Sequence, residues 1–315
     1  MADGHREVPT ADRTGVLVMA HGSPSSAEEI EAFYTRIRRG SAPSEAQLAE
    51  LRSRYDAIGG TSPLARRTEA QVTALREVLD EHGPGHFVVR FGAKHTEPFI
   101  EDAARDLLAI GPRRVITLVL TPHWSSRGSG EYLERAAGAL EGSLPVFPIR
   151  QWWDEPALIE LLAGRVRSAL GPEGALVLFT AHSLPQKVLA LGDPYAEQVA
   201  ASASAVAAAA GVDDWRVAWQ SAGRTPEPWL GPDLLDVLRE VGDQGVRDVV
   251  ICPIGFVADH LEVLYDIDIE ARKVARCAGV HLVRTESLND DPRFIEVLAD
   301  LVIRVDREHG TAPRP

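Results

Sequence analysis

Two histidines each follow an apolar run in similar surroundings. His21 lies in VLVMAHGSP, residues 16–24, and His182 lies in VLFTAHSLP, residues 177–185. Imidazole can take up a proton, give one up or bind a metal near neutral pH. Each ring could simply hydrogen-bond its own loop, but the paired placement favours two imidazoles that face one cleft from two sides.

Three carboxylates are spaced at i, i+4 and i+8 in residues 256–279, which predict a helix ending near Gly279. Glu262, Asp266 and Glu270 would share one face of it, and like charges at this spacing cost roughly 0.2–0.5 kcal/mol per pair. Glu262 and Asp266 have no basic residue three or four positions away. The face is either solvated or a path for a cation or protons, and carboxylates with nearby imidazoles suit a first-row divalent metal.

A cluster of arginines stands out in a chain of 315 residues with a net charge of −13. Seven arginines and three acids between Arg36 and Arg67 give a local charge of +4. The cluster could be a solvated helix surface. Arginine without lysine also suits the planar recognition of carboxylates or phosphates, so an anionic ligand is the alternative.

Strands alternating with helices must position these residues, which predicts an α/β fold with parallel sheets. Four apolar runs precede residue 151 and four follow residue 173: residues 15–20, 86–92, 113–120, 145–150, 174–181, 215–219, 246–253 and 279–284.

The two series match each other, which predicts two similar Rossmann-like lobes. The two AHxxP histidines are 161 residues apart, whereas Pro122 and Pro253 are 131 apart, so the first lobe carries an insertion of about thirty residues. We expect a tail over residues 1–14, a first lobe over 15–172 with a helical insertion at about 25–68, a second lobe over 173–309 and a tail over 310–315. The insertion holds the arginines, and SSAEE and SEAQ within it are capping-box patterns.

Composition narrows the function further. The acidic net charge argues against nucleic-acid binding. No apolar stretch is long enough to span a membrane and no signal-peptide core is present, so we expect a cytoplasmic protein without a membrane anchor. Two cysteines, Cys252 and Cys277, are too few for an all-cysteine iron–sulfur cluster.

At this point the chain resembles the ferrochelatases, which insert ferrous iron into a porphyrin. It is most similar to the soluble coproporphyrin-using type of Gram-positive bacteria. The resemblance runs from about Gly15 to the last helix and rests on several segments together: RYDAIGGTSPLA, KHTEPFIEDA, TAHSLP, GDPY, VAWQSAGRTPEPWLGPD and IGFVADHLEVLYDIDIE.

The resemblance implies roles for individual residues. His182 and Glu262 would flank the metal-insertion point as catalytic residues and inner metal ligands. His95, Asp266 and Glu270 would form an outer metal site along which hydrated metal or protons travel. Positions that hold the porphyrin and its propionates match a further set: His21, Arg38, Arg54, Tyr55, Ser62 and Tyr132.

Three of these residues could instead have purely structural roles. Tyr55 and Tyr132 could pack at the lip of the cleft, and Ser62 could cap a helix before Pro63. Which of the catalytic pair accepts protons and which meets the metal does not follow from sequence.

One residue departs from the family pattern. The relatives that the chain most resembles carry tyrosine at the position of His21, and that phenol can bind porphyrin iron opposite the catalytic histidine. Imidazole also binds iron, so His21 can keep an axial role.

The expected substrates are ferrous iron and coproporphyrin III, with no permanently bound cofactor and with transient contacts to neighbouring haem-pathway enzymes. Protoporphyrin IX is the alternative substrate. The polar, arginine-rich insertion favours the porphyrin with four propionates over the one with two.

Three rival functions predict different features. A sirohydrochlorin chelatase would share the two lobes and an early AHGS-like segment, but the acidic helix argues against it. A nicotinamide dehydrogenase would need a third glycine in SSRGSGEYL. A non-catalytic haem or porphyrin carrier would keep the cleft without needing both His182 and Glu262.

Overall fold

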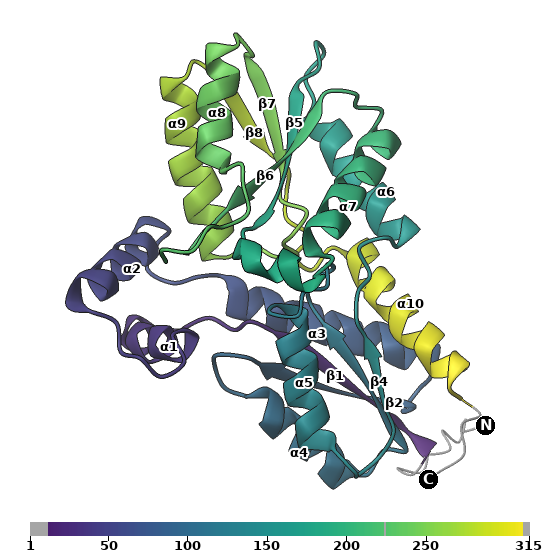
Figure 1. The fold of residues 1–315 in the computed structure, drawn as a ribbon. Helices are drawn as coiled ribbons and strands as arrows, with labels where there is room; N and C mark the ends of the chain where they lie inside the picture. The colour runs from purple at the N-terminus through teal and green to yellow at the C-terminus, as the bar shows by residue number, and fades with distance from the viewer. Residues whose placement is uncertain (1–11, 224, 311–315) are drawn as a thin grey trace.

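The computed structural model describes residues 12–223 and 225–310 and forms two α/β lobes, one above the other in Figure 1. The expected tails fall mainly outside the described residues. At the amino end the boundary was placed too late, because Thr14 is already a fully buried residue of the first strand.

Each lobe is built around a four-stranded parallel sheet, and the two sheets have the same order of strands. The first is ordered β2-β1-β3-β4 and the second β6-β5-β7-β8. The strands of the first sheet are β1 (Thr14–Ala20), β2 (Phe87–Ala93), β3 (Arg114–Val119) and β4 (Val146–Ile149). Those of the second are β5 (Leu176–His182), β6 (Trp215–Gln220), β7 (Asp248–Cys252) and β8 (His281–Arg284). The predicted pair of similar lobes is thereby confirmed.

The sheets are covered on both faces, which is why their strands are apolar without interruption. Along β1, Val16 and Val18 point to one face and Leu17 and Met19 to the other, and all four are fully buried. In the first lobe, α4 (Ile100–Ile110) and α5 (Ser129–Leu140) cover one face, and α3 (Leu64–His82) and α10 (Pro292–Glu308) pack on the other.

In the second lobe, α8 (Leu234–Asp243) and α9 (Arg272–Cys277) cover one face, and α6 (Pro156–Ala169) and α7 (Tyr195–Ala210) cover the other. The apolar cluster under α3 continues through α10 and α6 to α7, so one core joins the lobes. None of the helices in the described part of the chain is long and apolar enough to cross a membrane.

The lobes exchange helices. The helix α6 precedes the second sheet in sequence yet packs beside α7. The helix α10 follows the second sheet yet runs back along the side of the first lobe, where it packs on α3, β3 and β4 (Figure 1). Asp306 of α10 is held there by the nearly buried Arg114 of β3 at 2.5 Å and by Thr14 at 2.6 Å. The division expected between residues 172 and 173 therefore separates the two sheets but not these two helices.

The insertion in the first lobe stands beside the junction of the lobes in Figure 1. It consists of η2 (Ala27–Glu29), α1 (Ile30–Ile37) and α2 (Glu45–Ala57), whereas the second lobe has only η3 (Gln186–Leu191) between β5 and α7. The SEAQ capping box forms, with Ser44 and Gln47 bonding each other's backbone. In SSAEE, the Ser26 side chain caps nothing, and only Glu29 reaches back to a backbone N–H, that of Ser25.

Candidate active site

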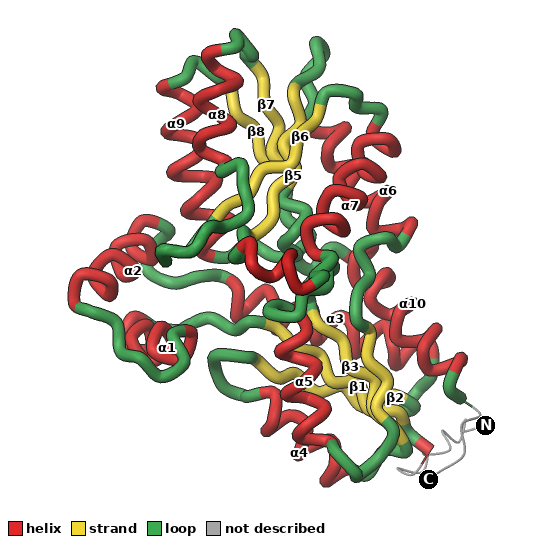
Figure 2. The backbone as a smooth tube through the Cα atoms, viewed as in Figure 1, coloured by secondary structure: helices red, strands yellow, loops and turns green. Residues whose placement is uncertain are grey.

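Two cavities are lined by residues of both lobes and share part of their lining. Loops of both lobes, green in Figure 2, come together between the two sheets. The outer cavity has a volume of about 690 Å³ and the inner one about 320 Å³, and both are lined by His21, Leu64, His260 and Glu262. Most of the predicted site residues lie on their walls. The outer cavity is also lined by Arg38, Arg54, Tyr55, Ser62, Asp266 and Glu270, and the inner one by Tyr132 and His182.

His182 is the last residue of β5, and its ring is oriented by its neighbours. Its Nδ1 donates to the carbonyl of Ser183, while the Tyr195 hydroxyl donates to the His182 carbonyl at 3.0 Å. The other ring nitrogen, Nε2, lies 3.6 Å from Oε1 of Glu262. Because Nδ1 donates to a backbone acceptor, Nε2 is the ring nitrogen that faces the carboxylate.

Glu262 is the meeting point of the two cavities and lies between two imidazoles. Its Oε2 is 3.6 Å from Nε2 of His260, whose Nδ1 donates to the Ala258 carbonyl at 2.9 Å. His260 was not predicted as a site residue from the sequence. The signal that could have found it is the spacing HxE, which places it two residues before the carboxylate.

The pair of His182 and Glu262 is ionic in the free protein. Burial alone would lower the pKa of His182, but the charge of Glu262 outweighs it and raises that pKa to about 9. Burial would raise the pKa of Glu262, yet His182 and His260 hold it well below its ordinary range. The imidazole is therefore protonated and the carboxylate ionised at neutral pH.

His21 approaches the same point from the first lobe. Its Nδ1 donates to the Gly22 carbonyl at 3.0 Å, so Nε2 is left for a ligand. His21 is exposed on the cavity wall. Partial desolvation of the ring inside the cleft lowers its pKa, which keeps the imidazole neutral and able to bind a metal. His21, His182 and His260 thus share one arrangement, with Nδ1 fixed by a backbone carbonyl.

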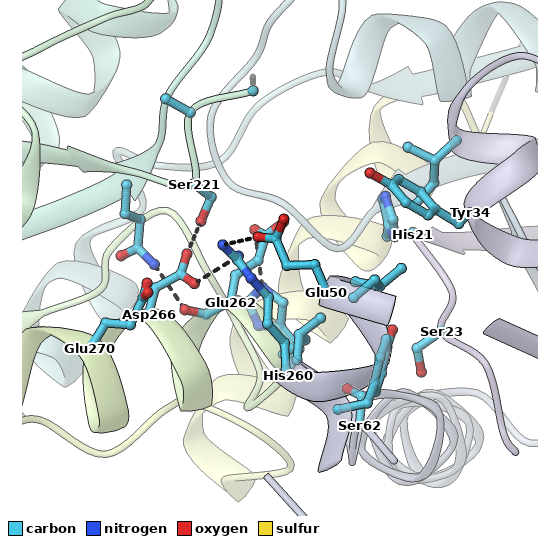
Figure 3. A pocket seen from close by; sticks show the side chains of 18 of the residues that line it. His21, Ser23, Tyr34, Glu50, Ser62, Ser221, His260, Glu262, Asp266 and Glu270 are labelled. Atoms are coloured by element: carbon cyan, nitrogen blue, oxygen red, sulfur yellow. Dashed lines mark hydrogen bonds and ion pairs between the residues drawn. The ribbon is translucent and has the colours of Figure 1, made fainter. Parts of the chain in front are cut away.

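The acidic face lies on a π-helix rather than on a regular α-helix. The element η4 (Glu262–Ala271) has i→i+5 bonding at its end, where the Arg272 N–H meets the Ile267 carbonyl, and α9 continues from it. Such widened turns are rare and frequently occur at functional sites. Figure 3 shows Glu262, Asp266 and Glu270 along this element, facing the outer cavity.

Asp266 is the more enclosed of the two outer carboxylates. Its side chain is 10% exposed and accepts a hydrogen bond from the Ser221 hydroxyl. Burial and the Glu262 charge raise its pKa to about 6, against the opposing effects of Ser221 and Arg54. This carboxyl can therefore change its protonation state near neutral pH.

His95 does not join the line of carboxylates that was expected. It lines neither cavity and packs against His21, with 4.7 Å between ring centroids, and against Phe33. Burial lowers its pKa to about 3, so it stays neutral behind His21. Within the described residues, no three His, Cys, Asp or Glu side chains are grouped closely enough to hold a metal ion.

Two members of the arginine cluster, Arg38 and Arg54, line the outer cavity. Arg38 donates to the Ser41 carbonyl, and no described acid forms an ion pair with it. Arg54 already contacts acids, since its guanidinium lies 3.4 Å from Glu50 and 3.6 Å from Asp266.

Tyr55 and Ser62 line the outer cavity and also contribute to the packing and hydrogen bonding of the first lobe. Tyr55 is only 2% exposed, and the Ser62 hydroxyl accepts a bond from the Leu64 N–H at the start of α3. Ser62 therefore bonds the backbone at the start of α3 and lines the cavity at the same time.

Tyr132 and Lys94 form one wall of the inner cavity. The Lys94 ammonium lies 4.9 Å from the centroid of the Tyr132 ring and 2.6 Å from Glu131. His123, 2% exposed, also lines this cavity, and neither of its ring nitrogens has a hydrogen-bond partner. Burial lowers the pKa of His123 to about 3, so a neutral donor and acceptor faces the inner cavity.

The arrangement combines three functions in one cleft. Two imidazoles of the second lobe face Glu262, and His21 of the first lobe lines the same cavities. Acids follow one another along η4, and cationic side chains lie on the cavity walls. Such a cleft can hold an anionic molecule while a divalent cation reaches it from the acidic side and protons leave through Glu262.

Comparison with known proteins gives a consistent result. The ferrochelatase family model matches residues 13–305. The coproporphyrin III ferrochelatase of Geobacillus thermodenitrificans is 44% identical over 300 residues, which cover 92% of this chain and 95% of that protein. The coproporphyrin III ferrochelatase of Bacillus subtilis is 42% identical over 302 residues, covering 93% and 97%.

Solved structures of chelatases share the fold. SirB from Bacillus subtilis with Fe3+ superposes with a TM-score of 0.59 at 14% identity, covering 95% of this chain and 98% of that one. CbiX, described as the terminal enzyme of sirohaem biosynthesis in denitrifying bacteria, gives 0.53 at 14% identity, covering 92% and 98%. At such identities these likenesses concern the fold alone.

Proposed function

The chain belongs to the ferrochelatase family, and on that premise we propose that it inserts Fe2+ into coproporphyrin III, giving iron coproporphyrin III on the route to haem b. The observation that carries this proposal is the position of Glu262. It faces His182 and His260 at 3.6 Å, begins the acidic face of η4 and belongs to both cavities.

The reaction requires two pyrrole protons to leave as the metal enters. Glu262 is ionised and can accept one of them directly. His182 carries a proton in the free protein, so it must first release that proton before Nε2 can accept another or bind the metal. An incoming dication favours this release, because a positive charge beside an imidazolium lowers its pKa.

Iron would approach from the outer carboxylates. Asp266 and Glu270 line the outer cavity but not the inner one, and Glu262 lines both. Oxygen ligands can replace waters of the hydrated ion stepwise. His21, neutral and with Nε2 unengaged by protein, would meet the iron from the first lobe, while His95 would support that ring by packing.

Coproporphyrin III is the porphyrin that best suits the walls. Its four propionates can meet Arg38 and Arg54 at the outer cavity and Lys94 at the inner one, and each well-held carboxylate can add roughly 1.5–3 kcal/mol if desolvated, and far less at an exposed rim. This binding energy can offset the bending of the macrocycle that exposes its nitrogen lone pairs. Tyr55, Ser62 and Tyr132 would contact the ring or its substituents.

The proposal includes no resident cofactor, since iron is a substrate and two cysteines cannot supply an all-cysteine cluster. It also includes action in the cytoplasm, where the free thiols of Cys252 and Cys277 would stay reduced. Transient contacts with neighbouring enzymes of the haem route remain part of the proposal.

The test is anaerobic incubation of the purified protein with Fe2+ and, separately, coproporphyrin III, protoporphyrin IX and sirohydrochlorin, followed by absorbance. We expect the highest kcat/KM with coproporphyrin III. Replacing Arg38 and Arg54 by alanine should narrow its advantage over protoporphyrin IX. Equal or better turnover of either competitor by the unchanged protein would contradict the proposed substrate.

The catalytic pair is tested in the same assay. Glu262→Gln keeps the shape of the side chain and removes its charge, so turnover should fall while porphyrin binding persists. His281→Ala is the control, because His281 is an exposed imidazole paired with Asp248 outside both cavities. Normal turnover by the Glu262 variant would refute its role.

A further inference from the structure

Arg54 links the insertion of the first lobe to the acidic helix of the second. It lies on α2, and its guanidinium is 3.6 Å from Oδ1 of Asp266 and 5.0 Å from the ring centroid of Tyr265, both on η4. Its other contact is Glu50, one turn earlier on its own helix. Figure 3 shows Glu50 and Asp266 directed toward the same part of the cavity.

Asp266 depends on this contact for its positive neighbour. The carboxylate is nearly buried, and along η4 it is followed by Glu270 and preceded by Glu262. Arg54 is the one cation that forms an ion pair with Asp266 among the described residues. Without that guanidinium, Asp266 would keep no ion-paired cation among the described residues. The wall of the cavity at Asp266 would then attract a divalent ion more strongly.

The contact is suited to being exchanged. At 3.6 Å it is longer than a direct hydrogen bond, and the Arg54 side chain is 27% exposed on the wall of the cavity. Arg38 on the same wall adds attraction for an anion. A carboxylate of the substrate that binds the planar fork with two hydrogen bonds would therefore displace the weaker contact with Asp266.

We propose that Arg54 couples the two substrates: a propionate that takes hold of its guanidinium withdraws the cation from Asp266 and opens the acidic face to the metal. This inference rests on the proposed function. Before the tetrapyrrole binds, the Arg54 guanidinium neutralises the Asp266 carboxylate. After a propionate has drawn the guanidinium away, Asp266 is free to bind a divalent cation.

Coupling of this kind is reciprocal, so each substrate should strengthen the binding of the other. It can be measured with Mn2+ as the probe cation, followed by electron paramagnetic resonance. The anion is zinc coproporphyrin III, which keeps four carboxylates but cannot accept a second metal at its centre. We expect saturating zinc coproporphyrin III to lower the Mn2+ dissociation constant by about fivefold or more.

Variants separate the role of Arg54 from the general attraction between an anionic ligand and a cation. In Arg54→Ala, Mn2+ should bind more tightly than in the unchanged protein without porphyrin, and the porphyrin should add little further. Arg54→Lys should restore part of the coupling. Asp266→Asn should remove the coupled Mn2+ binding and so locate the probe.

Arg67→Ala is the matched control, because Arg67 forms another arginine–aspartate pair between the lobes, with Asp290 at 3.1 Å, outside both cavities. Its coupling should equal that of the unchanged protein. Circular dichroism checks the fold of each variant, and the measurement on the unchanged protein stands alone if one fails to fold.

Two results would count against different conclusions. If zinc coproporphyrin III binds, as judged by its absorbance, but leaves Mn2+ affinity unchanged, or if coupling persists in Arg54→Ala, the coupling by Arg54 is overturned while the proposed function stands. If zinc coproporphyrin III does not bind the unchanged protein at all, the proposed function itself fails.

Discussion

Replacing Glu262 by glutamine should change the charge of His182, because the carboxylate is what keeps that imidazole protonated. The pKa of His182 is raised to about 9 from an ordinary value of 6.5, although burial acts in the opposite direction. Without the Glu262 charge, the contact with Ser183 and the more distant Asp266 still favour the proton, but burial opposes them. We expect the pKa to fall to about 6.5 or below.

The fall corresponds to a large change in population. At pH 7.5, roughly 97% of the rings are protonated when the pKa is about 9, and roughly 10% when it is 6.5. Histidine labelled with ¹³C at Cε1 reports each titration by nuclear magnetic resonance. The chain has ten histidines, so the signal of His182 is identified by its loss in His182→Gln.

An exposed acid provides the comparison. Glu240→Gln removes a carboxylate that pairs with Arg216 on the outside of the second lobe, and it should leave the His182 titration unchanged. A His182 pKa still near 9 in Glu262→Gln would refute the assignment of the shift to this carboxylate. A value below 7 in the unchanged protein would refute the ionic pair itself.

Three further outcomes are expected. His182→Ala should abolish iron insertion and change the coproporphyrin dissociation constant by less than about tenfold, since cations on the walls hold the propionates; near-normal turnover would exclude the assigned role. Turnover of the unchanged protein at saturating porphyrin should rise from pH 7 toward pH 9, as His182 loses the proton that a metal must displace; a profile that falls over this range would contradict it. Gly255→Ala should lower kcat and destabilise the protein by roughly 1–3 kcal/mol, because the new Cβ would lie 2.6 Å from Cβ of Ala181, beside His182. Thermal unfolding measures the stability and steady-state kinetics measure kcat. An unchanged kcat would show that the end of β5 tolerates displacement.

The architecture could be predicted because the duplication repeats local signals. An apolar strand that ends in AHxxP occurs twice, so both histidines were expected at equivalent strand ends, and both line the inner cavity. The exchange of α6 and α10 could not be predicted in this way. An amphipathic pattern tells which face of a helix is buried, but not which of two similar sheets buries it.

The site was harder to predict where it depends on contacts across the lobes. A pattern of Glu262, Asp266 and Glu270 fits an α-helix as well as a π-helix, because ten residues of side-chain periodicity do not distinguish the two hydrogen-bond registers. The family resemblance alone grouped His95 with the acids of η4. In the structure His95 packs against His21, and both histidines belong to the first lobe whereas the acids belong to the second. The contact between Arg54 and Asp266 joins α2 and η4, which are far apart in the sequence, so no local pattern predicts it.

The exchange of α6 and α10 has a mechanical consequence. Each lobe is underpinned by a helix that the chain supplies from beyond the other lobe, and a continuous apolar core passes through both helices. These two helices oppose a hinge motion between the lobes. Moving the lobes apart would disrupt the packing of α10 against α3 and of α6 against α7. The cleft between the lobes should therefore keep its shape when a flat ligand binds. Any mismatch between cleft and ligand would distort the ligand rather than the protein.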